Sequence, residues 1–286
     1  MSNNENSDLV RRVTTRGGVA MPALGLGTWR MGEERSRFDA EVAALRLGLD
    51  LGMDLIDTAE MYADGGAEAV TGEAVKGRRD AVFIVSKVVP QNASRRGTIE
   101  ACERSLGKLG TDRIDLYLLH WEGQHPLRDT LDAFAQLVDE QKIVHYGVSN
   151  LDVAAMATCD GLGGGPGVIA NQVIYNLSRR GIEWNLLPWC AERDIAVMAY
   201  SPLEAGRGLR GAGLSEVARR HGVSEACVAL AWTLRHAGVV SIPKASNPEH
   251  VRQNRQAHDL ALTGEDLALI DGDFPPPDGP VPLAIL

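Results

Sequence analysis

A regular alternation of short apolar runs with longer amphipathic stretches is the feature that most constrains this fold. Between the apolar runs, apolar residues recur at spacings of three and four, as in residues 39–51, 94–109, 127–140 and 224–236. Strands and helices that alternate along a chain imply parallel pairing with helical crossovers. The pattern therefore predicts an α/β fold, a (β/α)₈ barrel, with its eight strands at residues 24–27, 53–57, 82–86, 114–120, 143–149, 168–172, 195–200 and 239–243.

The length of the chain is compatible with a single barrel. Its 286 residues exceed the usual ~150 residues per domain, but α/β barrels commonly run to roughly 250 residues as one domain. No linker or compositional break divides the chain, so we expect residues 11–286 to form one domain after a disordered leader at residues 1–10. Gly17 and Gly18 lie between the apolar residues Val13 and Val19, which predicts a β-hairpin at the bottom of the barrel.

Charge and composition argue against several classes of protein. The net charge is −9 and no run of Lys and Arg forms a basic stripe, which argues against a nucleic-acid partner. No apolar stretch approaches the ~18 residues of a membrane span, and the leader has no apolar segment like that of a signal peptide. Cys102, Cys159, Cys190 and Cys227 form no CxxC pair, so we expect free thiols in a reducing cytoplasm. No sequence feature indicates a subunit interface, so a monomer is the default expectation.

Two other architectures fit the sequence less well than this barrel. A doubly wound nucleotide-binding fold would need a G-x-G-x-x-G motif after the first strand, and the segment from Gly25 to Arg30 lacks the third glycine. A metal-dependent barrel hydrolase or isomerase would need clustered His and carboxylate ligands at strand ends. Of the seven histidines only His120 lies convincingly at a strand end, and there is no HExxH or His-x-His motif, so we expect no metal.

Polar side chains follow three successive predicted strands at the point where each strand ends. Asp57 ends the second strand, with Tyr62 a few residues on, while Lys87 follows the third strand and His120 ends the fourth. Each alone has an ordinary interpretation as a turn, a loop aromatic, a solvated strand end or a core histidine. The carboxyl ends of barrel strands meet at one face, where active sites form. Together the four residues predict a catalytic group in which Lys87 pairs with Asp57, because an unpaired buried charge is costly.

Several segments in matching order resemble the aldo-keto reductase family. They are Asp57 to Tyr62, the strand that ends in Lys87, Leu118 to Trp121, Gly147 to Asn150, Asn171 and Gln172, Ala199 to Leu203, and Ile242 to Lys244, so the resemblance spans roughly residues 13–254. It implies an NAD(P)H-dependent oxidoreductase that reduces a carbonyl group by hydride transfer. Tyr62 would be the general acid, with its pKa lowered by Lys87, which Asp57 holds in place. His120 would orient the carbonyl oxygen and could relay the proton.

By the same resemblance NADPH is the expected cofactor. Ser149, Asn150 and Gln172 would hold its nicotinamide carboxamide, and the ring of Tyr200 would stack on the nicotinamide. Without the resemblance, Ser149 and Asn150 would be interpreted as a helix cap and Tyr200 as an aromatic residue at the barrel rim. Glycine lets the backbone approach a pyrophosphate closely, which is the reason for including Gly206. The expected cofactor contacts are Gly27, Thr28, Trp29, Asp57, Ser149, Asn150, Gln172, Tyr200, Ser201, Pro202, Leu203, Gly206, Ile242, Lys244, Ser246, His250, Gln253 and Asn254.

The motif for the adenosine 2′-phosphate departs from the family pattern. It begins at Lys244 and ends at Asn254 with the usual separation. Three residues between them replace the family's Ser, Arg and Glu, namely Ala245 with Ser246 beside it, His250 and Gln253. Arg gives permanently charged, bidentate contacts to phosphate, which His mostly does not give at neutral pH. Lys244 favours NADPH, and the use of NADH stays open.

The expected substrate pocket is lined by Trp29, Tyr62, His120 and Trp121. Only five residues separate Trp121 from the next helix, so long specificity loops are absent. An open pocket of this kind favours small aldehydes and α-ketoaldehydes, as in the bacterial methylglyoxal reductase branch of the family. The alternative function is a nicotinamide-sensing regulatory protein with slow or no turnover. For the proline-rich segment 275–282, the sequence leaves two placements open, either across the pocket mouth or loose.

Overall fold

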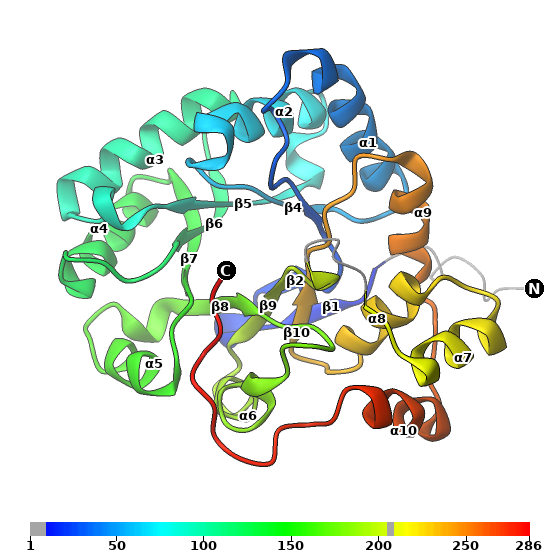
Figure 1. The fold of residues 1–286 in the computed structure, drawn as a ribbon. Helices are drawn as coiled ribbons and strands as arrows, with labels where there is room; N and C mark the ends of the chain where they lie inside the picture. The colour runs from blue at the N-terminus through cyan, green and yellow to red at the C-terminus, as the bar shows by residue number, and fades with distance from the viewer. Residues whose placement is uncertain (1–9, 205–208) are drawn as a thin grey trace, which may run out of the picture.

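The computed structural model describes residues 10–204 and 209–286, and these residues form a barrel (Figure 1). Eight parallel strands pair in their order along the chain, from β3 to β10. They are β3 Leu26–Gly27, β4 Leu55–Asp57, β5 Phe83–Val88, β6 Ile114–Leu119, β7 Ile143–Ser149, β8 Val168–Ile174, β9 Ala196–Tyr200 and β10 Val239–Ser241. The barrel closes where Gly25 N donates to Ser241 O at 2.9 Å and Gly27 N donates to Pro243 O at 3.0 Å. The predicted (β/α)₈ fold is confirmed.

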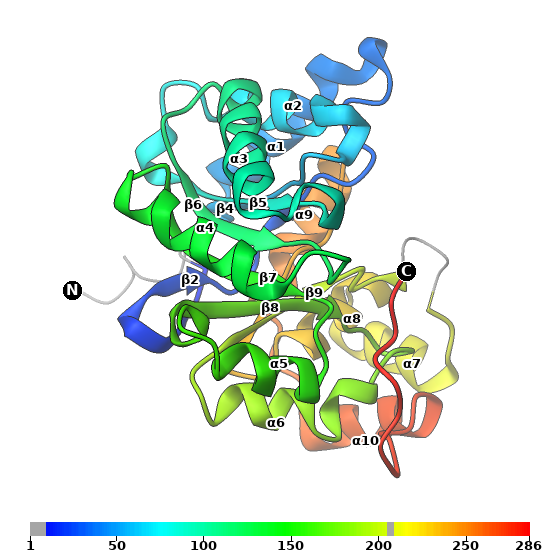
Figure 2. The same ribbon diagram turned by 90° about the vertical axis from the view of Figure 1, so that its left-hand side faces the viewer.

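Helices surround the strands, and local hydrogen bonds fix their ends (Figures 1 and 2). The side chain of Ser94 accepts a hydrogen bond from Gly97 N at 3.1 Å where α3 begins, and α3 ends at Gly110 in the left-handed conformation. Thr263 and Asp266 form a capping box where α10 begins. The helices are α1 Phe38–Asp50, α2 Gly66–Val75, α3 Arg95–Leu109, α4 Leu127–Asp139, α5 Val153–Asp160, α6 Leu186–Ala191, α7 Ala212–His221, α8 Glu225–Thr233, α9 Pro248–Gln256 and α10 Gly264–Asp273. Across the described ranges, none of these helices combines the length and apolarity needed to cross a membrane.

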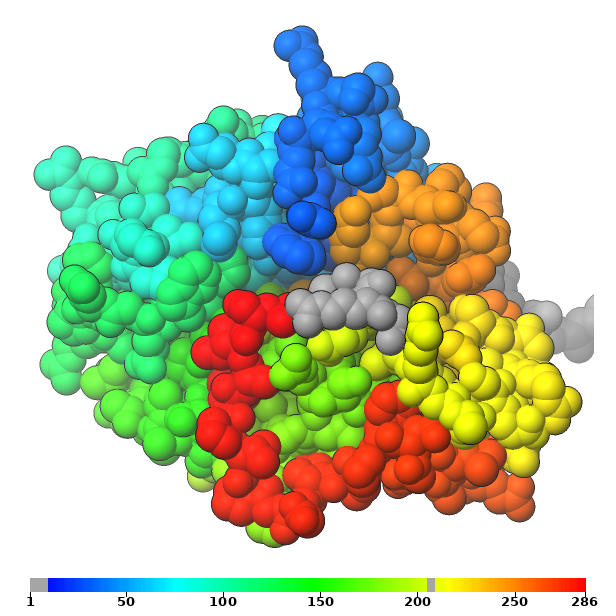
Figure 3. Space-filling view, in the orientation of Figure 1, coloured from blue at the N-terminus to red at the C-terminus, as the bar shows by residue number. Residues whose placement is uncertain are grey.

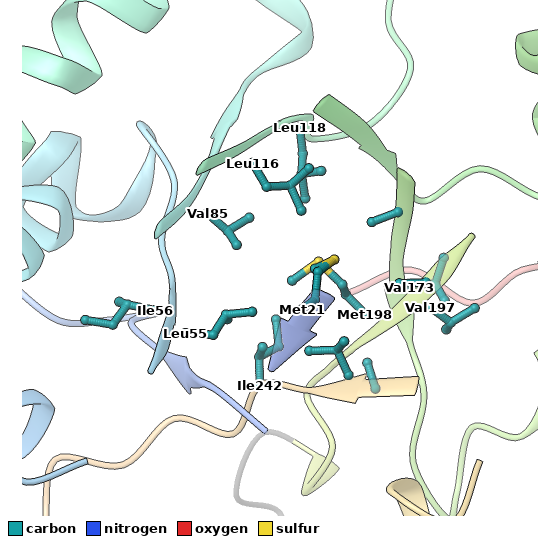
Figure 4. Packing of buried hydrophobic residues seen from close by; sticks show 14 of the residues in the cluster. Met21, Leu55, Ile56, Val85, Leu116, Leu118, Val173, Val197, Met198 and Ile242 are labelled. Carbon is teal, nitrogen blue, oxygen red and sulfur yellow. The ribbon is translucent and has the colours of Figure 1, made fainter. Parts of the chain in front are cut away.

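The predicted hairpin covers the amino-terminal end of the barrel. Strands β1 Arg12–Thr14 and β2 Ala20–Pro22 pair in antiparallel fashion around Gly17 and Gly18, whose φ angles are 75° and 76°. Arg16 N donates to Asp194 O at 2.6 Å, two residues before β9 begins. The side chain of Met21 is fully buried inside the barrel (Figure 4). The hairpin therefore closes the barrel bottom, and Figure 2 shows β2 on the opposite side of the barrel from the carboxyl end of the chain. Of the predicted leader only Val10 is described, and it is buried; residues 1–9 lie outside the described residues.

The strand period of two decides which side chains reach the barrel mouth. Figure 4 shows Leu55, Val85 and Leu118 directed toward the barrel interior, one from each of β4, β5 and β6. Side chains alternate between the two faces of a strand, so the residues two positions further on also point inward. These residues are Asp57, Lys87 and His120. The apolar layer below and the polar layer above it thus follow from one sequence pattern.

The segment after α10 runs along the outside of the barrel to its mouth. Residues 275–286 have no regular secondary structure, and the figures show them leading from α10 toward the carboxyl ends of β7 to β9 (Figures 1 and 3). The backbone N of Leu286 lies 3.4 Å from the hydroxyl of Tyr200, to which it donates a hydrogen bond. The side chain of Leu283 packs against the core. Of the two placements that the sequence leaves open, the structure therefore has the tail at the mouth.

Candidate active site

A buried ion pair lies at the centre of the candidate site. The side chain of Lys87 is fully buried, and its Nζ donates to Asp57 Oδ1 at 2.7 Å. The same Nζ donates to the carbonyl oxygen of Thr58 at 2.7 Å, and the second carboxylate oxygen of Asp57 accepts from Gln172 Nε2 at 2.7 Å. Burial is the largest single influence on the pKa of Lys87 and lowers it, but the neighbouring Asp57 and Tyr62 together outweigh burial, so the net shift is upward. Lys87 is therefore a cation held at one fixed place.

Tyr62 lies beside this ion pair because the chain turns sharply after β4. The turn η3, Tyr62–Gly65, contains Ala63 and Asp64 at φ angles of 51° and 52°, in the left-handed region. Lys87 Nζ lies 5.0 Å from the centre of the Tyr62 ring. Burial raises the pKa of Tyr62, and the positive charge of Lys87 opposes that rise without cancelling it. The lysine acts in the predicted direction, but the net shift is upward, so the phenol keeps its proton at neutral pH.

His120 faces Tyr62 and is electrically neutral. The two ring centres are 5.9 Å apart with an interplanar angle of 72°, an edge-to-face arrangement. Burial, together with the charge of Lys87, lowers the pKa of His120 to about 3. A neutral imidazole donates through one nitrogen only. His120 is thus suited to orient a carbonyl oxygen, and Trp121 packs on it with ring centres 4.7 Å apart.

Four predicted nicotinamide-binding residues form one hydrogen-bonded network beside the ion pair. Ser149 and Gln172 are paired between β7 and β8, and Ser149 Oγ donates to Gln172 O at 2.7 Å. Asn150, at a φ angle of 61°, donates through Nδ2 to Ser149 Oγ and to His120 O, both at 3.1 Å. Tyr200 Oη donates to Asn150 Oδ1 at 3.1 Å. Side-chain amides and hydroxyls of this kind fit a carboxamide, which offers both donors and an acceptor.

The predicted nucleotide-binding segments meet where the barrel closes. A Cβ on Gly27 would lie 2.7 Å from Ile242 O, so this seam requires glycine. Thr28 Oγ1 donates to Asp57 O at 2.9 Å, and Trp29 is 48 % exposed at the mouth. Lys244, bridged to Gly27, is exposed. The close backbone approach and the exposed cation suit a phosphorylated ligand.

The other predicted cofactor residues differ in how accessible they are. Ser246 Oγ is shielded from solvent and has no hydrogen-bond partner within the described ranges. Asn254 is buried, whereas His250 is exposed, and Gln253 Nε2 donates to Glu249 Oε1 at 3.2 Å. Pro202 is buried, Ser201 and Leu203 are partly buried, and Gly206 lies outside the described residues. Ser246 Oγ is therefore a polar atom of this segment that has no protein partner within the described ranges.

Some contacts in the site involve residues that the sequence interpretation did not single out. The carbonyl oxygen of Thr58 is the second acceptor for Lys87. Glu60 accepts hydrogen bonds from Val89 N at 2.9 Å and from Asn92 Nδ2 at 3.0 Å, which ties the segment after β4 to the end of β5. Thr58 and Glu60 both lie within the stretch from Asp57 to Tyr62 that carried the family resemblance, so the signal was present but unassigned.

No metal centre is evident in this region. In residues 10–204 and 209–286, His, Cys, Asp and Glu side chains form no group of three or more that is arranged to hold a metal ion. The four cysteines are free and buried.

Sequence comparison places the chain among reductases. The Aldo/keto reductase family model matches residues 23–212 and 209–272. The chain is 51% identical over 268 residues to the methylglyoxal reductase YeaE of Escherichia coli, covering 92% of this chain and 94% of that protein. It is 32% identical over 261 residues to the glyoxal reductase of Bacillus subtilis, covering 91% of each chain.

Structural comparison gives the same picture. An aldo/keto reductase from Klebsiella pneumoniae, crystallised in complex with NADP and acetate, superposes with a TM-score of 0.94. The sequence identity is 47%, and the match covers 97% of this chain and all of that one. A second crystal structure of an enzyme from the same organism, in complex with NADPH, matches with the same TM-score of 0.94 and the same identity of 47%.

Proposed function

The chain belongs to the aldo-keto reductase family and is an oxidoreductase, and we propose that it reduces small aldehydes and α-ketoaldehydes to alcohols with NADPH. The observation that carries this proposal is the buried Lys87–Asp57 pair beside the ring of Tyr62. Burial of a charge costs free energy, and a buried charge next to a proton donor is the arrangement expected at a reaction centre.

Tyr62 supplies the proton in the proposed reaction. Hydride addition to a carbonyl carbon produces an alkoxide, which needs a proton from a nearby acid. Burial raises the pKa of Tyr62, so its hydroxyl is protonated and ready to donate at neutral pH. The charge of Lys87 stabilises the phenolate that remains, and Asp57 keeps that charge in place. When bound, NADPH supplies the hydride.

His120 and two tryptophans position the substrate. Because burial lowers the pKa of His120 to about 3, its neutral ring orients the carbonyl oxygen by donating an N–H and carries no second proton. Trp121, packed on His120, and the exposed Trp29 form apolar walls at the mouth. Such walls suit the short carbon chain of a small aldehyde.

The cofactor's nicotinamide is assigned to the network of Ser149, Asn150, Gln172 and Tyr200. On binding, the carboxamide would replace some of the hydrogen bonds that these side chains make with one another. Gln172 also anchors Asp57, so the nicotinamide subsite and the catalytic ion pair share one residue. This shared residue holds the hydride donor near the proton donor.

The short connection between β6 and α4 supports small substrates. Only residues 120–126 join these two elements, so no long loop covers the mouth at this point. Relatives that match most of the chain are named methylglyoxal reductase and glyoxal reductase. These names, and the complete set of catalytic residues, favour turnover over the alternative of a nicotinamide sensor.

We further propose that residues 11–286 act as one domain and that the protein works as a monomer in the cytoplasm. The cysteines support the location: all four are buried, and burial raises the pKa of Cys102 and Cys190 to about 12. Free thiols of this kind are typical of reducing compartments. Size-exclusion chromatography with light scattering measures the oligomeric state.

The test is NADPH consumption with methylglyoxal and with an aromatic aldehyde, comparing the wild type with Tyr62→Phe. General acid catalysis contributes about 10²–10⁴-fold, so kcat should fall by at least about 100-fold in the variant. Tyr146→Phe is the matched control, because the Tyr146 hydroxyl binds Gly164 O at 2.8 Å and takes no part in the catalytic group. Its kcat should stay within about twofold of the wild type.

Three outcomes distinguish the possibilities. Turnover that collapses only in Tyr62→Phe supports the reductase and its general acid. Equal turnover by Tyr62→Phe and Tyr146→Phe would show that Tyr62 is not the general acid. Tight NADPH binding by the wild type without turnover of any aldehyde would favour the sensor.

A further inference from the structure

One cation is missing from the adenosine end of the proposed cofactor site. The family has an Arg where this chain has His250, and of the Lys and Arg residues in segment 244–254, which are Lys244 and Arg252, only Lys244 matches the family pattern. Lys244 is exposed beside the barrel seam, and the nearby Ser246 Oγ is shielded and has no partner within the described ranges. A phosphate monoester carries close to two negative charges at neutral pH, which one lysine balances poorly.

The connection between β3 and α1 brings other basic residues to the same place. Gly27 at the end of β3 is bridged to Lys244, so the chain leaves the barrel directly beside this lysine. It then passes through the turn η2, Arg35–Arg37, which leads into α1. Figure 1 shows α1 and α9 next to each other, and Figure 3 shows residues coloured for the two segments on one continuous face of the molecule. Arg37 is the last residue of this turn, directly before α1 begins.

Arg37 acts electrostatically on Lys244. Partial burial is the main cause that lowers the pKa of Lys244, the charge of Arg37 is the next, and Arg30 adds to it. Glu41 and Glu33 act in the opposite direction without restoring the ordinary pKa. The β3–α1 connection, which carries these charges, leaves the barrel beside Lys244, where Gly27 is bridged to it. Cations this close to each other repel, and a bound phosphate would relieve that repulsion.

The guanidinium of Arg37 is available for a ligand. Its side chain is 48% exposed, and its two ion contacts are long, 3.7 Å to Glu34 and 3.8 Å to Glu41. Glu41 also accepts a hydrogen bond from Gly32 N at 2.8 Å, so its carboxylate is shared with the backbone of the loop. The pair with Glu34 is exposed on both sides and contributes little, so the Arg37 guanidinium can exchange it for a stronger partner.

We propose that Arg37 takes the place of the family's arginine at position 250 and binds the 2′-phosphate of NADPH together with Lys244. This inference rests on the proposed function and adds a specificity determinant to it. The charge is supplied from the β3–α1 connection instead of from α9. Selectivity for NADPH over NADH then depends on a residue outside the motif in which the sequence places it.

The test measures binding and needs no turnover. Dissociation constants are determined by calorimetry for NADP⁺, NAD⁺, 2′,5′-ADP and 5′-AMP, with wild type, Arg37→Ala, Arg37→Lys and Arg35→Ala. Arg35 is the matched control, because it lies in the same exposed turn and carries the same charge. In Arg37→Ala, loss of one charge-assisted contact should weaken the binding of NADP⁺ and 2′,5′-ADP by about tenfold or more. NAD⁺ and 5′-AMP, which lack the 2′-phosphate, should change by less than about twofold.

Two further variants sharpen the result. Arg37→Lys should keep part of the affinity for 2′,5′-ADP, because lysine retains the charge without the planar fork. The double variant Arg37→Ala, His250→Arg should recover most of the lost affinity, since it returns the arginine to the family position. This recovery is not expected from a merely structural role of Arg37.

Several results would overturn the inference. They are equal losses of 2′,5′-ADP affinity in Arg37→Ala and Arg35→Ala, parallel losses for phosphorylated and unphosphorylated ligands, and a wild type that binds NADP⁺ no better than NAD⁺. A folded wild type that binds neither dinucleotide would instead refute the proposed function, and this inference with it.

Discussion

Replacement of Asp57 by Asn separates the charge of the buried ion pair from its shape. Asparagine keeps the size of the side chain and an oxygen that can accept from Lys87, but removes the negative charge. Lys87 is fully buried and Asp57 is 3% exposed, so water does not replace the lost partner. Removal of one member of a buried pair typically costs about 3–5 kcal/mol of unfolding free energy. Lys87 keeps its hydrogen bond to Thr58 O, so we expect a loss of about 3 kcal/mol.

The matched control is Asp50→Asn, which makes the same chemical change on the surface. Asp50 pairs with Arg78 at 2.6 Å, almost the distance of the buried pair, but the two side chains are 60% and 38% exposed. Exposed pairs contribute about 0–1 kcal/mol, so this variant should be close to the wild type in urea unfolding. The comparison isolates burial, because residue type and contact distance are matched.

The pH dependence gives a second, independent check. In the wild type the pKa of Lys87 is raised, so the stability that the pair provides is present below the ordinary value of 10.5 and is lost only as pH rises through the raised folded pKa. In Asp57→Asn, the largest influence that opposes burial is removed, so we expect burial to lower the pKa of Lys87. The variant then binds fewer protons folded than unfolded, so its stability rises with pH. Its deficit relative to wild type should be larger at about pH 6 than at about pH 9. A deficit no larger than that of Asp50→Asn, or one that does not change with pH, would refute this reasoning.

Two further predictions concern buried groups outside the catalytic centre. Burial raises the pKa of Glu68, and the hydrogen bond from Ser86 Oγ at 2.6 Å opposes that rise, so the contribution of Glu68 to stability is present below the ordinary pKa near 4.5 and is lost as pH rises. Glu68→Gln should therefore gain stability relative to the wild type between about pH 5 and about pH 8, as measured by urea unfolding. A stability difference that stays constant over this range would contradict the prediction. Burial raises the pKa of Cys102 and Cys190 to about 12 and of Cys159 and Cys227 to about 11. The native protein should therefore resist alkylation by iodoacetamide at about pH 8, while the urea-unfolded chain should take up one label per cysteine, as counted by mass spectrometry. Rapid labelling of the native protein would contradict this prediction.

The sequence predicts the barrel well because its strands are buried on both faces. Such strands are continuous apolar runs, and all eight predicted runs overlap strands of the structure, although β5 and β8 extend two residues past the predicted ends and β4 begins two residues later than predicted. The first and last are shorter than predicted, with β3 at Leu26–Gly27 and β10 at Val239–Ser241. At this seam regular pairing is replaced by the isolated bridges Leu24–Ser241 and Gly27–Lys244. Neither bridge has a signature in local composition.

The clustering of the candidate catalytic residues was predictable for a related reason. A strand period of two carries an inward apolar residue to an inward polar one at the strand end, as from Val85 to Lys87. The orientation of Tyr62 was not predictable in this way. It depends on the turn at Ala63 and Asp64, two non-glycine residues with positive φ angles, and only the family resemblance indicated its role. The upward shift of its pKa was also missed, because it arises from burial and not from a neighbouring charge.

In the proposed cofactor site, the nicotinamide end could be predicted from the sequence, but the charge at the adenosine end could not. Ser149, Gln172 and Tyr200 lie near the carboxyl ends of successive strands, so barrel topology brings them together independently of the conformation of the loops. Charge at the adenosine end obeys no such rule. A motif comparison registers His250 as the loss of a cation, because it compares positions one at a time. The phosphate responds to the total charge within a Debye length, regardless of which segment supplies it. Closure of the barrel places the β3–α1 connection against the segment after β10, and Arg37 thereby enters the field at Lys244. Cofactor preference in this protein should therefore follow the pair Lys244 and Arg37, and a motif confined to residues 244–254 should underestimate it.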